Sequence, residues 1–238
     1  MKRYLFMVMK EHPFGREMLR QLLAAGIRPQ LILEEDSQVA DVERAKFLER
    51  IAGHPVAPSI SEQAAAGKIP IVSVPIHDEA HSMEPIREID PDLIVFGATR
   101  IIRGEILRYP PDGVLNAHPG LLPECRGSAS PAWSVYHDIP IGSSCHFCTA
   151  EIDAGDLVGR REIPVRRGDR YEDLCHATLV MAGRLMRAAM EAYRDDRLDA
   201  LCRPQGKSPH PTFKNMPDEL LEVVRRKLRD ETYAHFVD

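Results

Sequence analysis

Short apolar segments alternate with helix-like segments along the first two-thirds of the chain, and this alternation is the strongest constraint on the fold. Strands are expected at the apolar runs Tyr4–Met9, Gln30–Leu33, Ile69–Val74, Leu93–Gly97 and Val114–Ala117. Helices are expected between them at Gly15–Gly26, Val39–Ala52 and Met83–Ile89. Strands separated by helices form βαβ units with right-handed crossovers. The sequence therefore predicts an α/β, Rossmann-like fold with a mostly parallel, twisted sheet and flanking helices.

Two of the connecting segments carry more specific expectations. In the second helix, apolar side chains at Val42, Ala45, Leu48 and Ile51 form one stripe and predict an amphipathic face. The segment Gly53–Gly67 contains prolines and three consecutive alanines and is expected to be a loop.

The pattern changes beyond Pro140. Two strands are expected at Gly142–Thr149 and Leu157–Val165, joined by a loop over 150–156. A long helix follows at Tyr171–Tyr193, with Asp169 as its expected N-cap and Glu172 as the capping-box partner. A Pro- and Lys-rich stretch then leads to a short charged helix at Pro217–Arg229. We predict a catalytic domain over residues 1–202 and a C-terminal tail with a short helix over residues 203–238.

Composition excludes several classes of protein. The formal net charge is -5, which disfavours a nucleic-acid partner because phosphate binding needs a basic face. No apolar stretch approaches the roughly 18–20 residues of a membrane span, so no membrane partner is expected. The five cysteines are an odd number and are scattered, which argues against a disulfide framework and fits a reducing compartment. The sequence therefore predicts a cytoplasmic protein.

One segment, residues 115–156, carries the residues that suggest chemistry. Asn116 and His118 lie two residues apart at the end of an apolar strand, so their side chains share one side of it. In an open α/β sheet, ligands bind at the carboxyl ends of the strands. An amide and an imidazole there could stabilise an oxyanion, and the carboxylate of Asp153 could orient the imidazole. Structural roles stay open for all three, because Asn and Asp favour turns and a histidine can be a hydrogen-bonded core residue.

The run NAHPGLLPECRG, followed by PAW, CHF and EIDAGD, resembles the signature of the folate-dependent formyltransferases. That family includes glycinamide-ribonucleotide, methionyl-tRNA and sugar-nucleotide amino formyltransferases. The likeness extends from about residue 1 to 193 and is strongest from Asp92 to Val165. It implies a formyltransferase fold, 10-formyltetrahydrofolate as co-substrate, and Asn116, His118 and Asp153 as the catalytic residues.

The resemblance also implies binding residues. The backbone of Arg100, Ile101 and Ile102 would hydrogen-bond the pterin ring of the folate. A loop containing Cys148, Thr149 and Ala150 would close over that ring. Two further residues, Arg126 and His146, would contact substrate or position Asp153.

The acceptor is expected to be a small amine. The loop Lys10–Gly15 holds one glycine and a proline, which makes a poor phosphate cradle and disfavours a ribonucleotide. About 45 residues follow the long helix, too few for the barrel of the tRNA enzymes. A nucleotide-linked amino sugar is the first expectation, and another biosynthetic amine or a carrier-bound aminoacyl group is the second. No metal is expected, because Cys145 and Cys148 would face opposite sides of a strand.

Two other functions remain open at this point. The same residues could hydrolyse 10-formyltetrahydrofolate, with water in place of the amine. The domain could also bind a folate or nucleotide without catalysis. A nicotinamide-binding protein is disfavoured, since no G-x-G-x-x-G follows the first strand. Members of the family are often dimers, so a homodimer is a further expectation of the resemblance.

Overall fold

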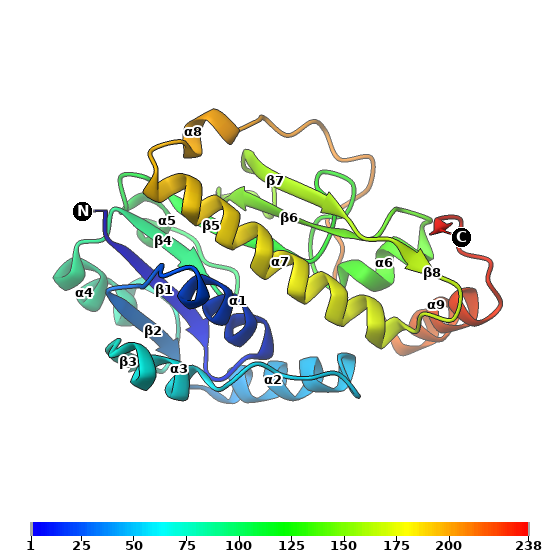
Figure 1. The fold of residues 1–238 in the computed structure, drawn as a ribbon, viewed down its shortest axis with the longest axis horizontal. Coiled ribbons are helices and arrows are strands. Elements are labelled where there is room, and N and C mark those ends of the chain that lie inside the picture. Colours follow the sequence, from blue (N-terminus) through cyan, green and yellow to red (C-terminus); the bar gives the residue numbers. More distant parts are fainter. Residues whose placement is uncertain (1, 238) are drawn as a thin grey trace.

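The computed structural model describes residues 2–237 and contains one large sheet with helices on both faces (Figure 1). The strand order is β3-β2-β1-β4-β5-β6-β7. The strands are β1 (Tyr4–Met9), β2 (Leu31–Glu35), β3 (Ile71–Val74), β4 (Leu93–Phe96), β5 (Val114–His118), β6 (Gly142–Phe147) and β7 (Leu157–Glu162). The first five run parallel, and β6 and β7 are antiparallel to their neighbours. This confirms the predicted α/β fold with a mostly parallel sheet.

Helices fill the connections between strands. Their bounds are α1 (Pro13–Ala24), α2 (Gln38–Arg50), α3 (Ile60–Gly67), α4 (Glu79–Ile89), α5 (Glu105–Arg108), α6 (Ser130–Tyr136), α7 (Tyr171–Arg194), α8 (Leu198–Leu201) and α9 (Asp218–Arg229). Near the C-terminus, β8 (Val165–Arg166) and β9 (Phe236–Val237) form a separate parallel pair. The expected helices at 171–193 and 217–229 are confirmed to within one residue at each end.

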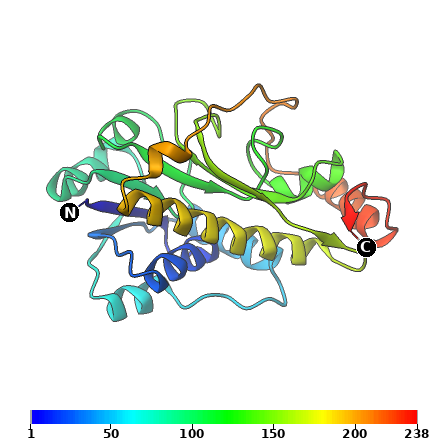
Figure 2. The ribbon, with the colours of Figure 1, turned by 45° about the horizontal axis from the view of Figure 1, so that its top comes forward.

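Each face of the sheet has its own apolar core, because side chains alternate along a strand. On one face, Phe6 and Val8 pack with residues of α1, α3 and α7. On the other, Leu5 and Met7 pack with residues of α4 and α5. Helix α7 runs lengthwise across the first face (Figures 1 and 2). Leu115 and Ala117 of β5 and Ser143 and Cys145 of β6 are among the residues that point toward α7.

Three local expectations were wrong. Residues 60–67 form α3 rather than a loop, and this helix begins with a capping box between Ser59 and Glu62. The expected apolar stripe of α2 is buried only at its C-terminal end, since Val42 is 50% and Leu48 39% exposed, whereas Ile51, the C-cap residue, is 2% exposed. The N-cap of α7 is Arg170, whose backbone N–H donates to the carboxylate of Asp173.

The segment 203–217, which we call the strap, connects α8 to α9 and crosses the loops after β5 and β6. Arg203 exchanges two backbone hydrogen bonds with Leu157 at the start of β7. Phe213 exchanges another pair with the loop after β5, donating to the carbonyl of Arg126 and accepting from the N–H of Ser128. Gly127 permits this approach, because a Cβ there would lie 2.1 Å from the Phe213 carbonyl oxygen.

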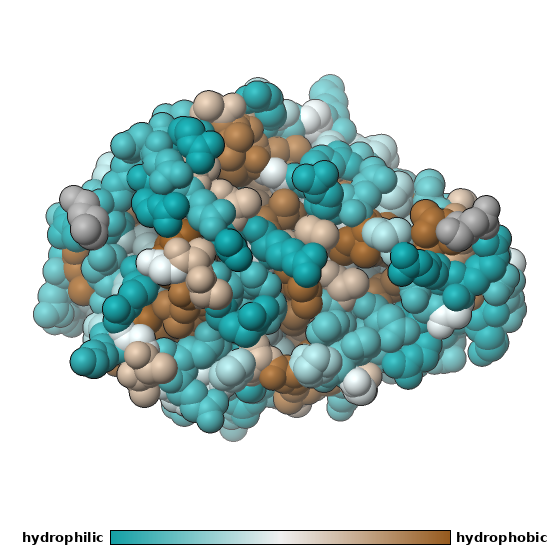
Figure 3. Space-filling model, viewed as in Figure 1, coloured by the Kyte–Doolittle hydropathy of each residue, from teal (hydrophilic) through white to brown (hydrophobic). Residues whose placement is uncertain are grey.

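The surface is mostly polar. Figure 3 shows hydrophilic residues over most of the face that carries α7, with small apolar groups between them. Among residues 2–237, no helix is both long and apolar enough to cross a lipid bilayer.

Candidate active site

The side chains of Asn116 and His118 project from β5 on the face of the sheet opposite α7. Their neighbours Leu115 and Ala117 pack into the core beneath α7, so alternation turns Asn116 and His118 the other way. Antiparallel pairing with β6 places His146 directly opposite Asn116 and Ser144 opposite His118. Two polar side chains from each strand therefore share one face.

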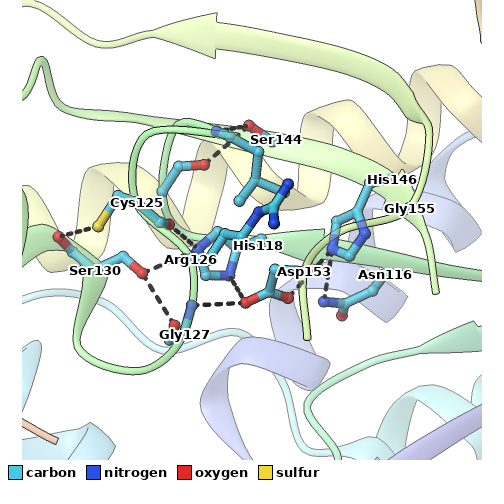
Figure 4. Close-up of polar contacts among 12 residues, drawn as sticks. Asn116, His118, Cys125, Arg126, Gly127, Ser130, Ser144, His146, Asp153 and Gly155 are labelled. Atoms are coloured by element: carbon cyan, nitrogen blue, oxygen red, sulfur yellow. Dashed lines mark hydrogen bonds and ion pairs between the residues drawn. The ribbon is translucent and has the colours of Figure 1, made fainter. Parts of the chain in front are cut away.

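Asp153 meets these residues from the loop between β6 and β7 (Figure 4). One carboxylate oxygen lies 3.4 Å from Nδ1 of His118, and the other lies 3.4 Å from Nε2 of His146. The backbone N–H of Gly127 donates to the same carboxylate at 2.8 Å. The structure therefore brings together the residues that the sequence pattern grouped, although His118 and Asp153 are far apart along the chain.

His146 connects Asn116 to Asp153. The Nδ2 of Asn116 lies 3.3 Å from Nε2 of His146. On the other side of the ring, Nδ1 lies 2.8 Å from the carbonyl oxygen of Phe147 and donates to it. This second contact fixes the orientation of the imidazole, so that Nε2 faces both Asn116 and Asp153.

The imidazole of His118 is held through its Nε2 atom, on the side of the ring away from Asp153. Its Nε2 lies 2.8 Å from the carbonyl oxygen of Cys125 and 3.0 Å from the hydroxyl of Ser130. A proton on Nε2 satisfies the carbonyl, and this leaves Nδ1 as a lone pair beside Asp153.

Burial and charge act in opposite directions on this pair. Burial alone would raise the pKa of Asp153, but the two imidazoles and the Gly127 N–H lower that pKa well below its usual range. Burial lowers the pKa of His118, and the charge of Asp153 opposes this only in part. The site therefore combines an ionised carboxylate with an imidazole that favours the neutral form at neutral pH.

Arg126 lies beside this group and links it to the strap. Its guanidinium donates to Glu151 at 3.2 Å, to the side-chain oxygen of Gln205 at 3.2 Å and to the carbonyl of Gly206 at 3.4 Å. Its Nε is buried and has no hydrogen-bond partner within the described chain. The arginine thus anchors loops while keeping one donor unused.

Gln205 is a residue of this region that the sequence reasoning missed. Its amide donates to the carbonyl oxygens of Asp153 at 3.0 Å and Gly155 at 2.5 Å. It therefore holds the backbone of the loop that carries Asp153. A glutamine in a polar tail has no local pattern that would have indicated this contact.

The segments expected to bind a folate meet near the same edge of the sheet. Ile102 and Cys148 pack against the same apolar cluster, on the face that carries Asn116. Along residues 100–102, no backbone N–H or carbonyl bonds to another group in residues 2–237, so these groups are available to a ligand. Ile101 is 62% exposed, and Thr149 and Ala150 are also at the surface.

Glu35, also missed from the sequence, fixes the conformation of the loop at 100–102. Its side chain is fully buried at the end of β2 and accepts a hydrogen bond from Nε of Arg100 at 2.8 Å. The backbone N–H of His77 donates to it at 2.9 Å. Although burial favours the protonated acid, these partners lower the pKa of Glu35 to about 2. The only indication of this role in the sequence was that the apolar run of β2 ends in two acidic residues.

Cys145 and Cys148 lie on opposite faces of the sheet, in two different apolar clusters. Burial raises the pKa of the Cys145 thiol to about 12 and also raises that of Cys148. All five cysteines are free thiols. Within residues 2–237, no group of three or more His, Cys, Asp or Glu side chains is arranged to hold a metal ion.

Known proteins resemble this chain in sequence and in fold. The family model described as formyl transferase matches residues 2–190. The methionyl-tRNA formyltransferase of Syntrophus aciditrophicus is 32% identical over 155 residues, which cover 61% of this chain and 49% of that protein. The chain thus spans about half the length of the curated relatives it matches.

Solved structures share the fold. Glycinamide ribonucleotide transformylase 1 from Symbiobacterium toebii superposes with a TM-score of 0.64 at 19% identity, over 82% of this chain and 89% of that chain. A sugar N-formyltransferase from a Shewanella species superposes with a TM-score of 0.60 at 17% identity, over 91% of this chain and 78% of that chain. At these identities, the likeness concerns the fold alone.

Proposed function

The chain belongs to the formyl transferase family, and we propose that it transfers the formyl group of 10-formyltetrahydrofolate to the amine of a small acceptor. The observation that carries this proposal is the position of Asp153 between His118 and His146, beside Asn116. We assign Asn116, His118 and Asp153 as the catalytic residues. His146 positions Asp153 and the Asn116 amide.

Asn116 stabilises the negative charge that develops on the formyl oxygen. Its amide nitrogen has two N–H donors, and only one of them faces His146. The other is free to donate to the oxygen as the amine attacks. One such donor typically contributes about 10²–10³ in rate.

His118 takes the proton that the amine loses. Its Nδ1 keeps a lone pair that can accept this proton, because Nε2 is bonded to the Cys125 carbonyl. After proton transfer the imidazole is cationic, and the ionised carboxylate of Asp153 at 3.4 Å stabilises that cation. This sequence requires no enzyme nucleophile.

The folate is held by backbone groups and an apolar wall. Arg100, Ile101 and Ile102 offer unbonded N–H and carbonyl groups, while Ile102 and Cys148 supply apolar contact. The loop at Cys148, Thr149 and Ala150 covers the ring from the other side. A flat heteroaromatic ring with several donors and acceptors fits this combination.

We propose a nucleotide-linked amino sugar as the acceptor, with another biosynthetic amine as the second choice. The segment after β1 supports this, because its glycine, Gly15, lies in the first turn of α1 and is used for packing. A Cβ on Gly15 would lie 2.2 Å from the Gly97 carbonyl oxygen, so the segment is not free to form a phosphate cradle. Arg126, with its unused Nε, would contact this acceptor.

The remaining assignments are also proposals. We place the catalytic domain at residues 1–202 and the tail at 203–238, which contributes Gln205 to the site. Five free thiols support a cytoplasmic location. A homodimer is proposed from the family resemblance alone.

The test is to incubate the protein with 10-formyltetrahydrofolate and a panel of amines that includes nucleotide-linked amino sugars. Mass spectrometry should detect an amine that gains one formyl group. Asn116→Ala and His118→Ala should lose turnover and retain folate affinity, whereas His81→Ala, which removes an exposed histidine on α4, should behave as wild type. Undiminished turnover in Asn116→Ala and His118→Ala would refute the assigned roles.

The same assay without amine tests the alternative of hydrolysis. Release of formate at the same rate with and without every amine would identify a 10-formyltetrahydrofolate hydrolase. Folate binding with neither product would identify a protein that only binds the cofactor.

A further inference from the structure

A cavity of about 320 Å³ lies between α2, the start of α7 and α9, beside the loop that precedes α6. Its apolar lining includes Ala129, Met216 and Leu221, and its charged lining includes Arg50 and Arg225. Tyr171 closes the floor, where it is buried. Three of these residues, Met216, Leu221 and Arg225, lie beyond the region matched by the family model.

Arg50 is the unusual residue of this cavity. Its side chain is half-buried, yet no other group in residues 2–237 forms a hydrogen bond or ion pair with it. By contrast, Arg225 contacts Glu172 at 3.3 Å and Glu222 at 2.8 Å. The acids in the lining, Glu49 and Asp218, are exposed at its rim. A bound oxyanion would give this guanidinium the partner that it lacks.

The positive charge of Arg50 acts on two buried side chains, Tyr171 and His12. Burial raises the pKa of Tyr171, and the charges of Arg50 and Arg225 oppose that rise. Burial also lowers the pKa of His12 to about 3, and Arg50 adds to this lowering. His12 caps α1 three residues after β1, and its ring lies 4.9 Å from that of Phe47 in α2, so the end of α2 that carries Arg50 lies near the carboxyl edge of the sheet.

The cavity is close to the catalytic residues. Gly127 touches the carboxylate of Asp153 at 2.8 Å, and Ala129 in the cavity wall lies two residues further along the chain. Two residues span at most about 7 Å, so the wall lies within roughly 10 Å of that carboxylate. An acceptor with its amine at Asp153 could therefore place a second group in the cavity.

We propose that this cavity binds a phosphoryl group of the acceptor amine and that Arg50 determines this specificity. The planar guanidinium offers several donors in the geometry that phosphoryl oxygens accept. The apolar lining would contact the carbon skeleton next to the phosphate. The inference rests on the proposed function for the identity of the acceptor, while the binding of a phosphoryl group can be measured without turnover.

The direct test is calorimetric titration with inorganic pyrophosphate at constant ionic strength. Wild type should bind it saturably, and Arg50→Gln should weaken binding by about tenfold to a hundredfold. Arg184→Gln is the control, because it removes the same charge from an exposed position on α7 outside the cavity. Met216→Trp, which fills the cavity from the α9 side, should weaken binding independently. The absence of saturable binding to wild type, or wild-type affinity in both cavity variants, would overturn the proposal.

Kinetics provide the second test. With matched amines that do and do not carry a phosphoryl group, Arg50→Gln should raise KM for the phosphorylated amine and leave KM for the folate unchanged. Equal KM values of wild type for both amines would also overturn the proposal. If wild type formylates no amine, the proposed function fails and the pyrophosphate titration alone decides whether the cavity is an oxyanion site.

Discussion

Replacing Gln205 with leucine should loosen the loop that carries Asp153. The glutamine amide donates to the carbonyl oxygens of Asp153 and Gly155, and its oxygen accepts from Arg126 at 3.2 Å. Leucine has a similar size but makes none of these bonds. The two carbonyls would lose a donor that comes from the strap, outside the segment matched by the family model.

The magnitude follows from the number of bonds. A hydrogen bond contributes about 0.5–1.5 kcal/mol net, so the two donated bonds contribute about 1–3 kcal/mol to holding the loop closed. A change of about 2 kcal/mol alters the ratio of closed to open loop roughly 30-fold. If the closed loop is the reactive form, turnover should fall by a similar factor.

Hydrogen exchange measures this opening directly. The Gly127 N–H is protected by the Asp153 carboxylate, so its exchange should accelerate about 30-fold in Gln205→Leu. Gln205→Glu keeps the acceptor for Arg126 but loses the donors, and it should show most of the effect. Lys207→Leu, an exposed position in the same strap, is the matched control. Wild-type exchange and turnover in both Gln205 variants would show that the strap does not position Asp153.

Three other perturbations test the site and its supports. Because the pKa of Asp153 is lowered in the folded state, its carboxylate stabilises the fold above a pH of about 4 and loses this effect as the pH falls further. The difference in unfolding free energy between wild type and Asp153→Asn, measured by urea titration, should therefore shrink below that pH. Arg100→Met leaves Glu35 buried without its cation and should cost about 3 kcal/mol in the same assay. Gly127→Ala should release the strap, since the backbone there has φ of 98° and the added Cβ meets Phe213, and limited proteolysis should then cut within residues 203–217.

The parallel half of the sheet could be predicted because its central strands are buried on both faces. β1 and β4 are continuous apolar runs, and such runs mark strands covered by helices on both sides. The periodicity of α7 located its ends for a similar reason, since one long face is buried. For α2 the prediction was wrong over most of the stripe, because periodicity shows that a helix is amphipathic and does not show how much of its apolar face other residues cover. The helix α3 was missed because the glycine and prolines that precede it predicted a loop, although Ser59 and Glu62 form a capping box.

The positions of the proposed catalytic residues could be predicted from the sequence only where the geometry of a single strand determines them. Asn116 and His118 share a face because residues two apart in a strand always do. The contact of Asp153 with His118 follows from strand pairing and from a loop residue with φ of 50°, and no spacing rule gives either. Gln205 and Glu35 act through contacts 52 and 65 residues away in sequence, so periodicity carried no information about them.

The change of strand direction after β5 explains why the polar group lies where it does. Helix α7 covers one face of β5 and β6, so the opposite face receives Asn116, His118 and His146. Loops, the strap and Ser130 at the start of α6 surround these side chains. The loops and the strap supply the donors that hold Asp153, namely the Gly127 N–H and the side-chain amide of Gln205. A carboxylate could not remain ionised and nearly buried there without the two imidazoles and the Gly127 N–H, because desolvation alone would protonate it. The antiparallel edge therefore supplies the imidazoles, and the strap supplies the backbone restraint that keeps the carboxylate between them.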